Sequence, residues 1–252
     1  MDKIALITGA TAGIGYSTAL KLAEYGFNLL VTGRREERLK NLKTEIENYY
    51  GVKTHSLCFD VQDKNEVYNS IENLPDEWKN IDVLINNAGL AAGLNTVQEG
   101  DTEDWERMID TNIKGLLYIT RKVAPYMIEK EKGHIINVGS IAGKEVYKYG
   151  NVYCATKHAV DALTKGMRID MLEKNIKVTQ ISPGMVETEF SLVRFKGDKE
   201  KAEKAYQGFT PLSGEDIAEI ILFTITRPPH VNINDIVITA TEQANSFYKN
   251  VK

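Results

Sequence analysis

Short apolar runs alternate with longer amphipathic segments along the whole chain. Seven runs are rich in Val and Ile and apolar at most positions: KIALIT, NLLVTG, KTHSLCF, DVLINN, GHIINVGS, KVTQIS and DIVITA. Such runs are typical of strands buried on both faces of a parallel sheet. Intervening segments such as REERLKNLKTEIENYY are amphipathic and helix-like. The alternation predicts an α/β fold, a Rossmann-type doubly wound sheet of about seven parallel strands with helices on both faces.

The chain is long enough for one substantial core and has no sign of division into parts. It has 252 residues, of which 42% are apolar, and it contains no linker, repeat or low-complexity tract. We therefore expect a single dinucleotide-binding and catalytic domain over residues 1–252. Residues 184–211 lack a strand-like run and include SLVRFKGDKEKAEKAYQ. A long excursion of this kind is often a lid, so we expect a substrate loop there.

Charge and composition exclude several classes of function. The formal net charge is −4, which gives no electrostatic support for nucleic-acid binding. No apolar run approaches the ~20 residues of a membrane helix, and the first residues lack the layout of a secretory signal. Cys58 and Cys154 lie far apart, so we expect no disulfide framework and a cytoplasmic location. The four histidines are scattered, so we expect no metal site.

A glycine-rich turn follows the first strand-like run. Gly9, Gly13 and Gly15 have the spacing G-x-x-x-G-x-G, and the predicted helix begins among them. Glycine permits close backbone approaches, and the amides at a helix N-terminus can bind a pyrophosphate. A tight turn alone could explain such a cluster. Its position in the first strand-to-helix turn of a parallel-sheet protein favours dinucleotide binding.

The end of the second strand-like run indicates which dinucleotide is bound. An NAD-binding protein usually places an acidic residue there to bind the ribose 2′-hydroxyl. Here Gly33 is followed by Arg34 and Arg35, and a guanidinium is suited to a 2′-phosphate. The alternative is a solvated helix start in which both arginines pair with Glu36 and Glu37. Because a cation at a helix N-terminus is unfavourable, we expect an anionic ligand and predict NADP(H) as the cofactor.

Further motifs give the chain a close resemblance to the short-chain dehydrogenase/reductase family. They are TGATAGIG, Asp60 in FDV, NNAG at 86–89, Asn112 in TNIKG, Ser140 in VGSIAG, Tyr153 and Lys157 in YCATK, and SPG at 182–184. The resemblance implies that Asn112, Ser140, Tyr153 and Lys157 form the catalytic tetrad. Together with the glycines and arginines, it predicts a cofactor site of Gly9, Thr11, Gly13, Ile14, Gly15, Arg34, Arg35, Asp60, Val61, Asn87, Ala88, Gly89, Tyr153, Lys157, Pro183, Gly184, Val186 and Thr188.

The spacing of Tyr153 and Lys157 fits this chemistry. Positions i and i+4 share a face of a helix, so the phenol and the ammonium can reach the same small volume. We expect the ammonium to lower the pKa of the phenol from ~10, so that Tyr153 works as acid or base. Ser140 can hydrogen-bond the reacting oxygen. The resemblance implies that Asn112 holds a water connected to Lys157.

A narrower resemblance suggests the substrate. GRREERL, LPDEWKNIDVLINNAGLA, GNVYCATK, TEFSLVRFKGDKEKAEKAY and PPHVNIN look like the NADP-dependent 3-hydroxy acid dehydrogenases. That group implies oxidation of the C3 hydroxyl of L-serine, L-allo-threonine or 3-hydroxyisobutyrate, and reduction of the corresponding 3-oxo compounds. Such a substrate needs a carboxylate anchor. Arg194 is the first candidate, ahead of Lys196 and Lys199, and joins Ser140 and Tyr153 as a predicted substrate residue. Alternatively, Arg194 pairs with an acidic residue inside its loop.

Two other functions fit the same motifs. One is a broad-specificity NADPH carbonyl or 3-oxoacyl reductase. The other is a non-catalytic NADP-binding regulator, which the full tetrad argues against. The resemblance also implies a homotetramer or homodimer, with the helix that carries Tyr153 and the long helix before it at an interface. The apolar residues of LLYITRKVAPYMI, spread over more than one helix face, are consistent with this.

Overall fold

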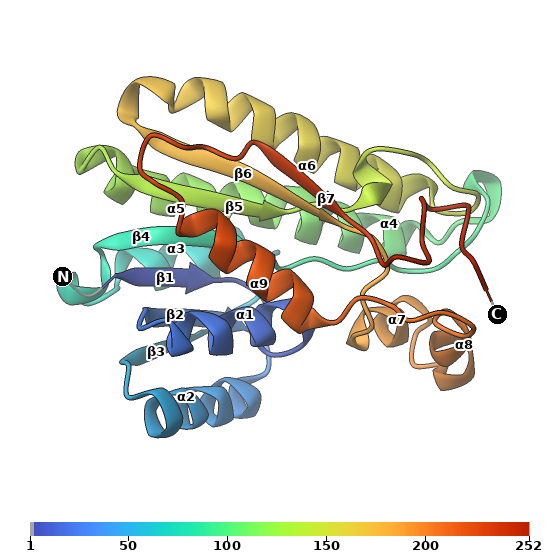
Figure 1. Ribbon diagram of the computed structural model, residues 1–252, viewed down its shortest axis with the longest axis horizontal. Coiled ribbons are helices and arrows are strands. Elements are labelled where there is room, and N and C mark those ends of the chain that lie inside the picture. Colours follow the sequence, from blue (N-terminus) through green and yellow to red (C-terminus); the bar gives the residue numbers. More distant parts are fainter. Residues whose placement is uncertain (1–2, 252) are drawn as a thin grey trace.

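Figure 1 shows the computed structural model of the protein, which describes residues 3–251. Within that range seven strands form one sheet in the order β3-β2-β1-β4-β5-β6-β7, and every neighbouring pair is parallel. Each predicted run overlaps one strand, so the predicted sheet is confirmed. The strands are β1 (Ile4–Ile7), β2 (Asn28–Gly33), β3 (Thr54–Cys58), β4 (Ile81–Asn86), β5 (Gly133–Val138), β6 (Ile176–Pro183) and β7 (Asp235–Ile238).

Helices connect the strands and cover both faces of the sheet. The α-helices are α1 (Gly13–Glu24), α2 (Glu36–Tyr50), α3 (Lys64–Glu72), α4 (Thr102–Ile109), α5 (Leu116–Glu129), α6 (Asn151–Asp170), α7 (Glu189–Arg194), α8 (Lys199–Lys204) and α9 (Gly214–Ile225). The short 3-10 helices are η1 (Asp76–Trp78), η2 (Val97–Glu99), η4 (Ile141–Gly143) and η5 (Leu172–Lys174), and η3 (Asp110–Gly115) is π-helical. Across residues 3–251, no helix is both long and apolar enough to cross a bilayer.

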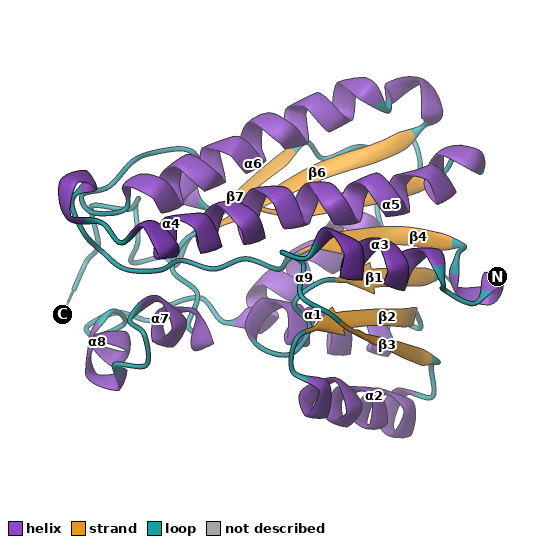
Figure 2. Cartoon of the chain, turned by 180° about the vertical axis from the view of Figure 1, so that it is seen from behind, coloured by secondary structure: helices purple, strands orange, loops and turns teal. Residues whose placement is uncertain are grey.

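The sheet separates two apolar cores, and strand β1 contributes to both. Ile4 and Leu6 pack in the core beneath α3, α5 and α6, whereas Ala5 and Ile7 pack in the core beneath α1, α2 and α9. The two layers are visible from opposite sides in Figure 1 and Figure 2. Because successive side chains of a strand point to opposite faces, a strand buried on both faces must be apolar at every position. This requirement explains the near-continuous apolar runs in the sequence.

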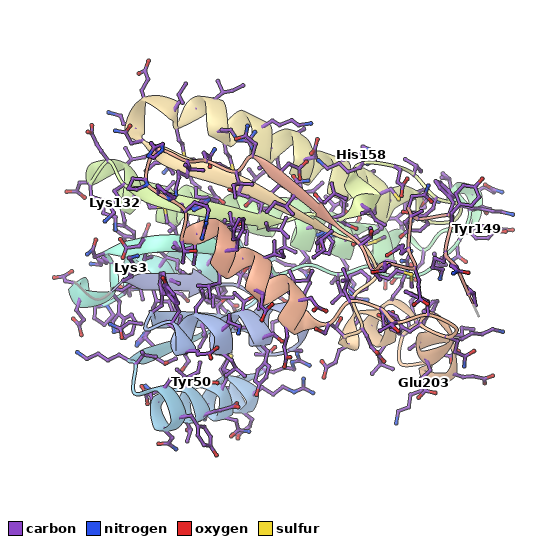
Figure 3. The ribbon with its side chains drawn as sticks, in the orientation of Figure 1. Lys3, Tyr50, Lys132, Tyr149, His158 and Glu203 are labelled. Atoms are coloured by element: carbon purple, nitrogen blue, oxygen red, sulfur yellow. The ribbon has the colours of Figure 1, made fainter. Side chains whose placement is uncertain are left out.

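The strand order reverses beside β1, and this reversal locates the binding crevice. The chain runs from β1 to β2 on one side, and β4 pairs with β1 on the other. The loops after β1 and β4 therefore separate at the carboxyl edge of the sheet, where doubly wound proteins bind ligands. In Figure 3, Tyr149 and Glu203 mark the end of the molecule beyond this edge, and Lys3 and Lys132 mark the opposite end.

The amphipathic segment EDWERMIDTNIKGLLYITRKVAPYMIEKE is not one regular α-helix. A π-helical turn, η3, separates α4 from α5 and contains Asn112. Gly115, the last residue of that turn, packs against Val61 in the loop after β3. A Cβ added to Gly115 would lie 2.9 Å from Val61 Cγ2. π-Turns inside helices often occur at functional sites because they redirect side chains. This turn is the local feature that positions Asn112.

The excursion at 184–211 contains the two short helices α7 and α8 and no strand, as expected from its sequence. Val186 and Leu212 form an isolated parallel bridge that joins the two ends of the excursion. Thr188 caps α7 by accepting a hydrogen bond from the Phe190 amide at 3.2 Å. The excursion is therefore a closed loop that leaves the sheet after β6 and returns before α9.

The glycine turn gives a stability prediction with an internal control. A Cβ on Gly15 would lie 2.3 Å from the Gly9 carbonyl oxygen, whereas a Cβ on Gly166 in α6 would meet no atom within 4 Å. Gly15→Ala should lower the free energy of unfolding by about 1–3 kcal/mol through overpacking. Gly166→Ala should raise it by about 0.5–1 kcal/mol, because alanine is the better helix former. Urea unfolding followed by circular dichroism measures both. Equal effects from the two variants would contradict this account of the turn.

Candidate active site

A cavity of about 330 Å³ opens at the carboxyl edge of the sheet, over β1, β4 and β5. It is lined by all of the predicted cofactor residues except Gly15. Gly15 lies behind the glycine turn, where it packs against the Gly9 carbonyl and the Asn87 amide. Ser140, Tyr153 and Lys157 line the same cavity. The structure therefore brings together residues from the first and the last thirds of the chain in one site.

The glycine turn provides the conditions for binding a pyrophosphate. Helix α1 begins at Gly13, its N-cap residue Ala12 makes no side-chain cap, and its first turn contains no acidic residue. The first amides of a helix lack partners within the helix and carry partial positive charge, so they suit an anion. Gly9 has a φ of +68°, in the left-handed region that favours glycine. This local geometry fits the phosphates of a dinucleotide.

The arginines at the end of β2 face the cavity and have carboxylate partners. Arg34 Nη1 lies 3.3 Å from Asp60 Oδ2. Arg35 donates to Thr11 Oγ1 from Nη2 at 2.8 Å and to Glu189 Oε2 from Nη1 at 2.7 Å. The alternative pairing with the acidic residues at the start of α2 is wrong, because Glu36 and Glu37 pair with Lys40. Both arginines can therefore contribute to binding an anionic group at the cavity mouth.

Tyr153 and Lys157 occupy one face of α6 and are buried at the bottom of the cavity. Their exposed fractions are 8% and 6%. Lys157 Nζ donates to the Val138 carbonyl at the end of β5 over 2.9 Å and lies 6.0 Å from the centre of the Tyr153 ring. The i, i+4 spacing thus brings both groups to one place. Their burial excludes the alternative that Tyr153 and Lys157 are a pair on the solvated surface of the helix.

Burial changes the proton affinities of this pair, and here the structure corrects the sequence-based expectation. Burial, followed by the neighbouring Tyr147, raises the pKa of Tyr153 above its ordinary value of 10.0, although a hydrogen bond with Ser140 acts in the opposite direction. Burial lowers the pKa of Lys157 to about 8. We expected Lys157 to lower the pKa of Tyr153, and that was wrong because desolvation of the phenolate dominates. At neutral pH the phenol keeps its proton.

Ser140 lies in the tight turn between β5 and η4. Its Oγ accepts a hydrogen bond from the Ala142 amide at 3.1 Å and lies 3.4 Å from the Pro183 carbonyl. Two residues earlier in the chain, β5 ends at Val138, whose carbonyl holds Lys157. The end of β5 therefore positions both Ser140 and the amine of Lys157.

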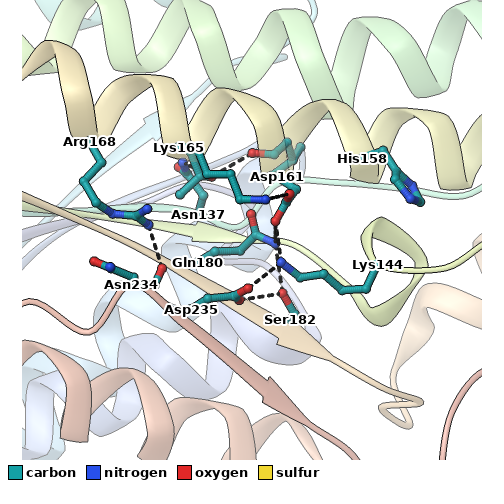
Figure 4. A network of polar contacts seen from close by, with 12 residues as sticks. Asn137, Lys144, His158, Asp161, Lys165, Arg168, Gln180, Ser182, Asn234 and Asp235 are labelled. Carbon is teal, nitrogen blue, oxygen red and sulfur yellow. Dashed lines mark hydrogen bonds and ion pairs between the residues drawn. The ribbon is translucent and has the colours of Figure 1, made fainter.

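A polar network fixes this turn to the helix that carries Tyr153 (Figure 4). Lys144, just after η4, forms ion pairs with Asp161 on α6 and with Asp235 on β7. Asp161 also pairs with Lys165 at 2.5 Å, and Ser182 Oγ donates to Asp235 Oδ1 at 3.1 Å. The network connects the turn that contains Ser140 with α6 and β7, so it fixes the position of Ser140 relative to α6.

The side chain of Asn112 makes hydrogen bonds that the sequence did not predict. Its Oδ1 accepts from the Leu90 amide, and its Nδ2 donates to the Leu90 carbonyl, both at 2.9 Å. Nδ2 also donates to Thr156 Oγ1 on α6 at 3.0 Å. The side chain thus joins the loop after β4 to α6. A Cβ on Gly89 would lie 3.3 Å from Asn112 Oδ1 and 3.5 Å from Lys157 Nζ, so a small residue is needed there.

Arg194, the predicted anchor, lies beside Tyr153 at the end of α7. Its Nη2 donates to Tyr147 Oη at 2.8 Å, and its guanidinium carbon is 5.5 Å from the centre of the Tyr153 ring. Its Nε is buried without a hydrogen-bond partner in the described part of the chain. Arg194 lines a small cavity on the other side of Tyr153 and does not line the large one. The alternative of an ion pair within its loop is wrong, because its partner is Tyr147.

Of the two other candidate cations of the excursion, Lys199 is exposed at the start of α8 and lines neither cavity, and Lys196 is already engaged. Lys196 Nζ lies 2.8 Å from Asp104 Oδ2 and 3.1 Å from Asp101 Oδ2. Asp104 is buried, so this pair fixes the end of α7 to α4. The carbonyl of Arg194 also accepts from the Gly93 amide at 3.1 Å. These contacts hold Arg194 in place and remove Lys196 as an anchor.

Four residues of the site were not predicted from the sequence. Leu90 and Thr156 hold Asn112, and Glu189 and Arg38 form a second pair at the cavity mouth, where Arg38 Nη1 donates to Glu189 Oε1 at 2.7 Å. The sequence contains no signal for these contacts, because the partners are separated by long stretches of chain. Residues 3–251 contain no cluster of three His, Cys, Asp or Glu side chains that could hold a metal ion.

Comparisons with known proteins show the family of this chain. A family model described as short chain dehydrogenase matches residues 3–198. The NADP-dependent 3-hydroxy acid dehydrogenase YdfG of Escherichia coli strain K12 is 46% identical over 242 residues, 96% of each chain. Sulfoacetaldehyde reductase 2 of Chromohalobacter salexigens is 43% identical over 249 residues, 98% of each chain. The closed form of serine dehydrogenase complexed with NADP+ has a TM-score of 0.91 and 45% identity, over 96% of this chain and 97% of that chain. The chain belongs to the short-chain dehydrogenase family.

Proposed function

We propose that the protein oxidises the C3 hydroxyl of small 3-hydroxy acids with NADP and reduces the corresponding 3-oxo acids. L-Serine, L-allo-threonine and 3-hydroxyisobutyrate represent the substrate class. The observation that carries the proposal is the guanidinium of Arg194 beside the Tyr153 ring, with no carboxylate partner among the described residues. The similarity to a 3-hydroxy acid dehydrogenase and to serine dehydrogenase supports the same class.

The enzyme is an oxidoreductase and its cofactor is NADP(H). The residues fit this cofactor in two places. The free amides at the start of α1 suit the pyrophosphate, and Arg34 and Arg35 suit the 2′-phosphate. When bound, the nicotinamide accepts the hydride in alcohol oxidation and donates it in carbonyl reduction. The tasks left to the protein are binding, orientation and proton transfer.

Tyr153 is the proposed proton-transfer group. Because its phenol stays protonated at neutral pH, it can donate its proton to a carbonyl oxygen during reduction. In oxidation the same oxygen takes the proton of the substrate hydroxyl and releases its own proton toward Lys157, whose pKa burial lowers to about 8. Ser140, which lines the same cavity as Tyr153, can donate to the reacting oxygen and stabilise its developing negative charge. Once Lys157 holds that proton, its positive charge stabilises the negative charge that develops on the phenol oxygen during oxidation. We also propose, from the resemblance, that Asn112 holds a water that connects Lys157 to solvent.

Arg194 and Tyr147 form the proposed carboxylate site. In a 3-hydroxy acid, one carbon separates the hydroxyl-bearing carbon from the carboxylate, so the anchor must lie close to Tyr153. Arg194 meets this requirement, and its unpaired Nε and the Tyr147 hydroxyl offer donors to two carboxylate oxygens. We further propose that residues 184–211 act as a lid, because this segment carries Arg194 and the cavity-lining Phe190, whose ring lies 5.6 Å from that of Tyr153.

A second candidate is the reduction of a small oxo sulfonate. The relative named sulfoacetaldehyde reductase 2 is 43% identical over 98% of this chain. A sulfonate carries the same single charge as a carboxylate, and a guanidinium and a phenol can bind both.

The two other functions considered from the sequence fit less well. A broad carbonyl reductase would have no use for the Arg194 guanidinium, which lies beside Tyr153 without a carboxylate partner among the described residues. A non-catalytic NADP-binding protein would have no use for the enclosed Tyr153 and Lys157.

Exposed apolar side chains support the proposal of a homotetramer or homodimer. Ile169 on α6 is 75% exposed, and Leu172 just after it is 71% exposed. Leu117 on α5 is also exposed. These positions lie on or next to the two helices implicated by the sequence. A contact between copies of the chain would bury them, and closed symmetry would make such a contact isologous.

The anchor prediction compares a charged substrate with a neutral one. Arg194→Leu should lower kcat/KM for L-serine and 3-hydroxyisobutyrate at least about thirtyfold, because it removes a partly buried partner of the carboxylate. The value for a neutral secondary alcohol should change less than about threefold. Steady-state kinetics with NADP measure both, and Lys199→Leu in the same segment is the control and should change neither. An equal loss for acids and for the neutral alcohol would eliminate the carboxylate role.

The pH dependence follows from the buried pair. Because the pKa of Lys157 is lowered to about 8 and that of Tyr153 is raised, the pair holds both protons at pH 7 and loses the first near pH 8. The fully protonated pair suits carbonyl reduction, and the singly deprotonated pair suits alcohol oxidation. We expect kcat/KM for oxidation to rise with pH through about 8 and that for reduction to fall over the same range. Profiles that are flat from pH 7 to 9 in both directions would contradict this assignment.

A further inference from the structure

Glu189, the first residue of α7, is held by two arginines at the mouth of the cofactor cavity. Its Oε2 accepts a hydrogen bond from Arg35 Nη1 and its Oε1 accepts one from Arg38 Nη1, both at 2.7 Å. Arg35 also donates to Thr11 Oγ1 from Nε at 3.1 Å and from Nη2 at 2.8 Å. The cluster therefore joins the glycine turn, the start of α2 and the excursion at 184–211.

These ion pairs contribute little to the stability of the fold. The side chains of Arg35, Arg38 and Glu189 are between 40% and 46% exposed. Ion pairs with this exposure are typically worth ~0–1 kcal/mol. Partial burial acts against the charge of Glu189, but hydrogen bonds from both arginines outweigh it and lower its pKa. The carboxylate is thus ionised at neutral pH, and the reason for its position must be sought in binding.

Glu189 and the cofactor need the same donors. Arg35 and Glu189 both line the large cavity, and Arg35 is one of the two residues assigned to the 2′-phosphate. Carboxylates and phosphates bind the same face of a guanidinium fork. A phosphate that binds Arg35 must therefore displace Glu189 or share the fork with it, and two anions that share a fork repel each other.

We propose that Glu189, which Arg38 holds in place, is a specificity-determining residue that competes with the 2′-phosphate of the cofactor for Arg35. The inference rests on the proposed use of NADP. Glu189 weakens the binding of dinucleotides that carry the 2′-phosphate and leaves NAD-type binding unchanged, so it limits how far the arginines favour NADP(H) and helps NADP(H) to leave. The exchange of partners occurs on α7, the same short helix that ends at Arg194 beside Tyr153.

The test uses two nucleotides that differ by one phosphate. 2′,5′-ADP and 5′-AMP are titrated calorimetrically into the full-length wild-type protein, Glu189→Gln and Glu187→Gln. Glu187 is an exposed carboxylate two residues earlier and takes no part in the ion pairs of Arg35 and Arg38. Glu189→Gln should bind 2′,5′-ADP roughly three- to tenfold more tightly, the size expected for two exposed ion pairs. Its affinity for 5′-AMP should stay within about twofold, and Glu187→Gln should match the wild type with both nucleotides.

Each other outcome has a distinct meaning. If Glu189→Gln binds 2′,5′-ADP more weakly, Glu189 orients the arginines and the competition is overturned. If its affinity for 2′,5′-ADP is unchanged, or if both nucleotides gain equally, Glu189 does not discriminate and the inference fails while the cofactor assignment stands. If the wild type binds 2′,5′-ADP no more tightly than 5′-AMP, the 2′-phosphate subsite is absent and the proposed cofactor use fails as well.

Discussion

Burial of the Lys157 amine at the end of β5 is the constraint on which the rest of the site depends. Removing an ammonium from water is costly unless it is paired, and no carboxylate in the described chain pairs with this one. The Val138 carbonyl is its hydrogen-bond acceptor, so the strand end and α6 must stay in register. The lowered pKa of Lys157 is the direct result. A lysine that changes charge near physiological pH, beneath a tyrosine, fits the role in proton transfer that we propose for this pair.

The supports around this pair come from several layers of the fold. Asn112 fixes the loop after β4 to α6, and Lys144 fixes the turn containing Ser140 to α6 and β7. At the far side, α7 is held at one end by Glu189 and beyond its other end by Lys196. Arg194 lies between these two attachments. Of the proposed catalytic groups, Asn112, Tyr153 and Lys157 are therefore carried by helices, and Ser140 is carried by a turn that is fixed to α6. The proposed substrate anchor is carried by an excursion with two charged attachments.

The sequence predicts the sheet well and the contacts of the site less well. Strands are encoded locally, because burial on both faces requires apolar runs, and the glycine turn and the Tyr153–Lys157 spacing are equally local. The raised pKa of Tyr153 could not be read from that spacing, because it depends on burial by distant segments. The pairing of Arg35 with Glu189 joins residues far apart in sequence, and no local pattern predicts it. Arg194 could be proposed from chemistry alone, but its partner Tyr147 could not.

The most direct test of the proposed activity is an initial-rate assay at 340 nm with matched substrate pairs. L-Serine is compared with ethanolamine, and 3-hydroxyisobutyrate with 2-methyl-1-propanol, each with NADP and with NAD. The members of a pair differ in the carboxylate, so the comparison isolates its contribution. We predict much faster reduction of NADP than of NAD, and turnover of the acids far above that of the matched alcohols. Equal turnover within each pair, or a preference for NAD, would contradict the account.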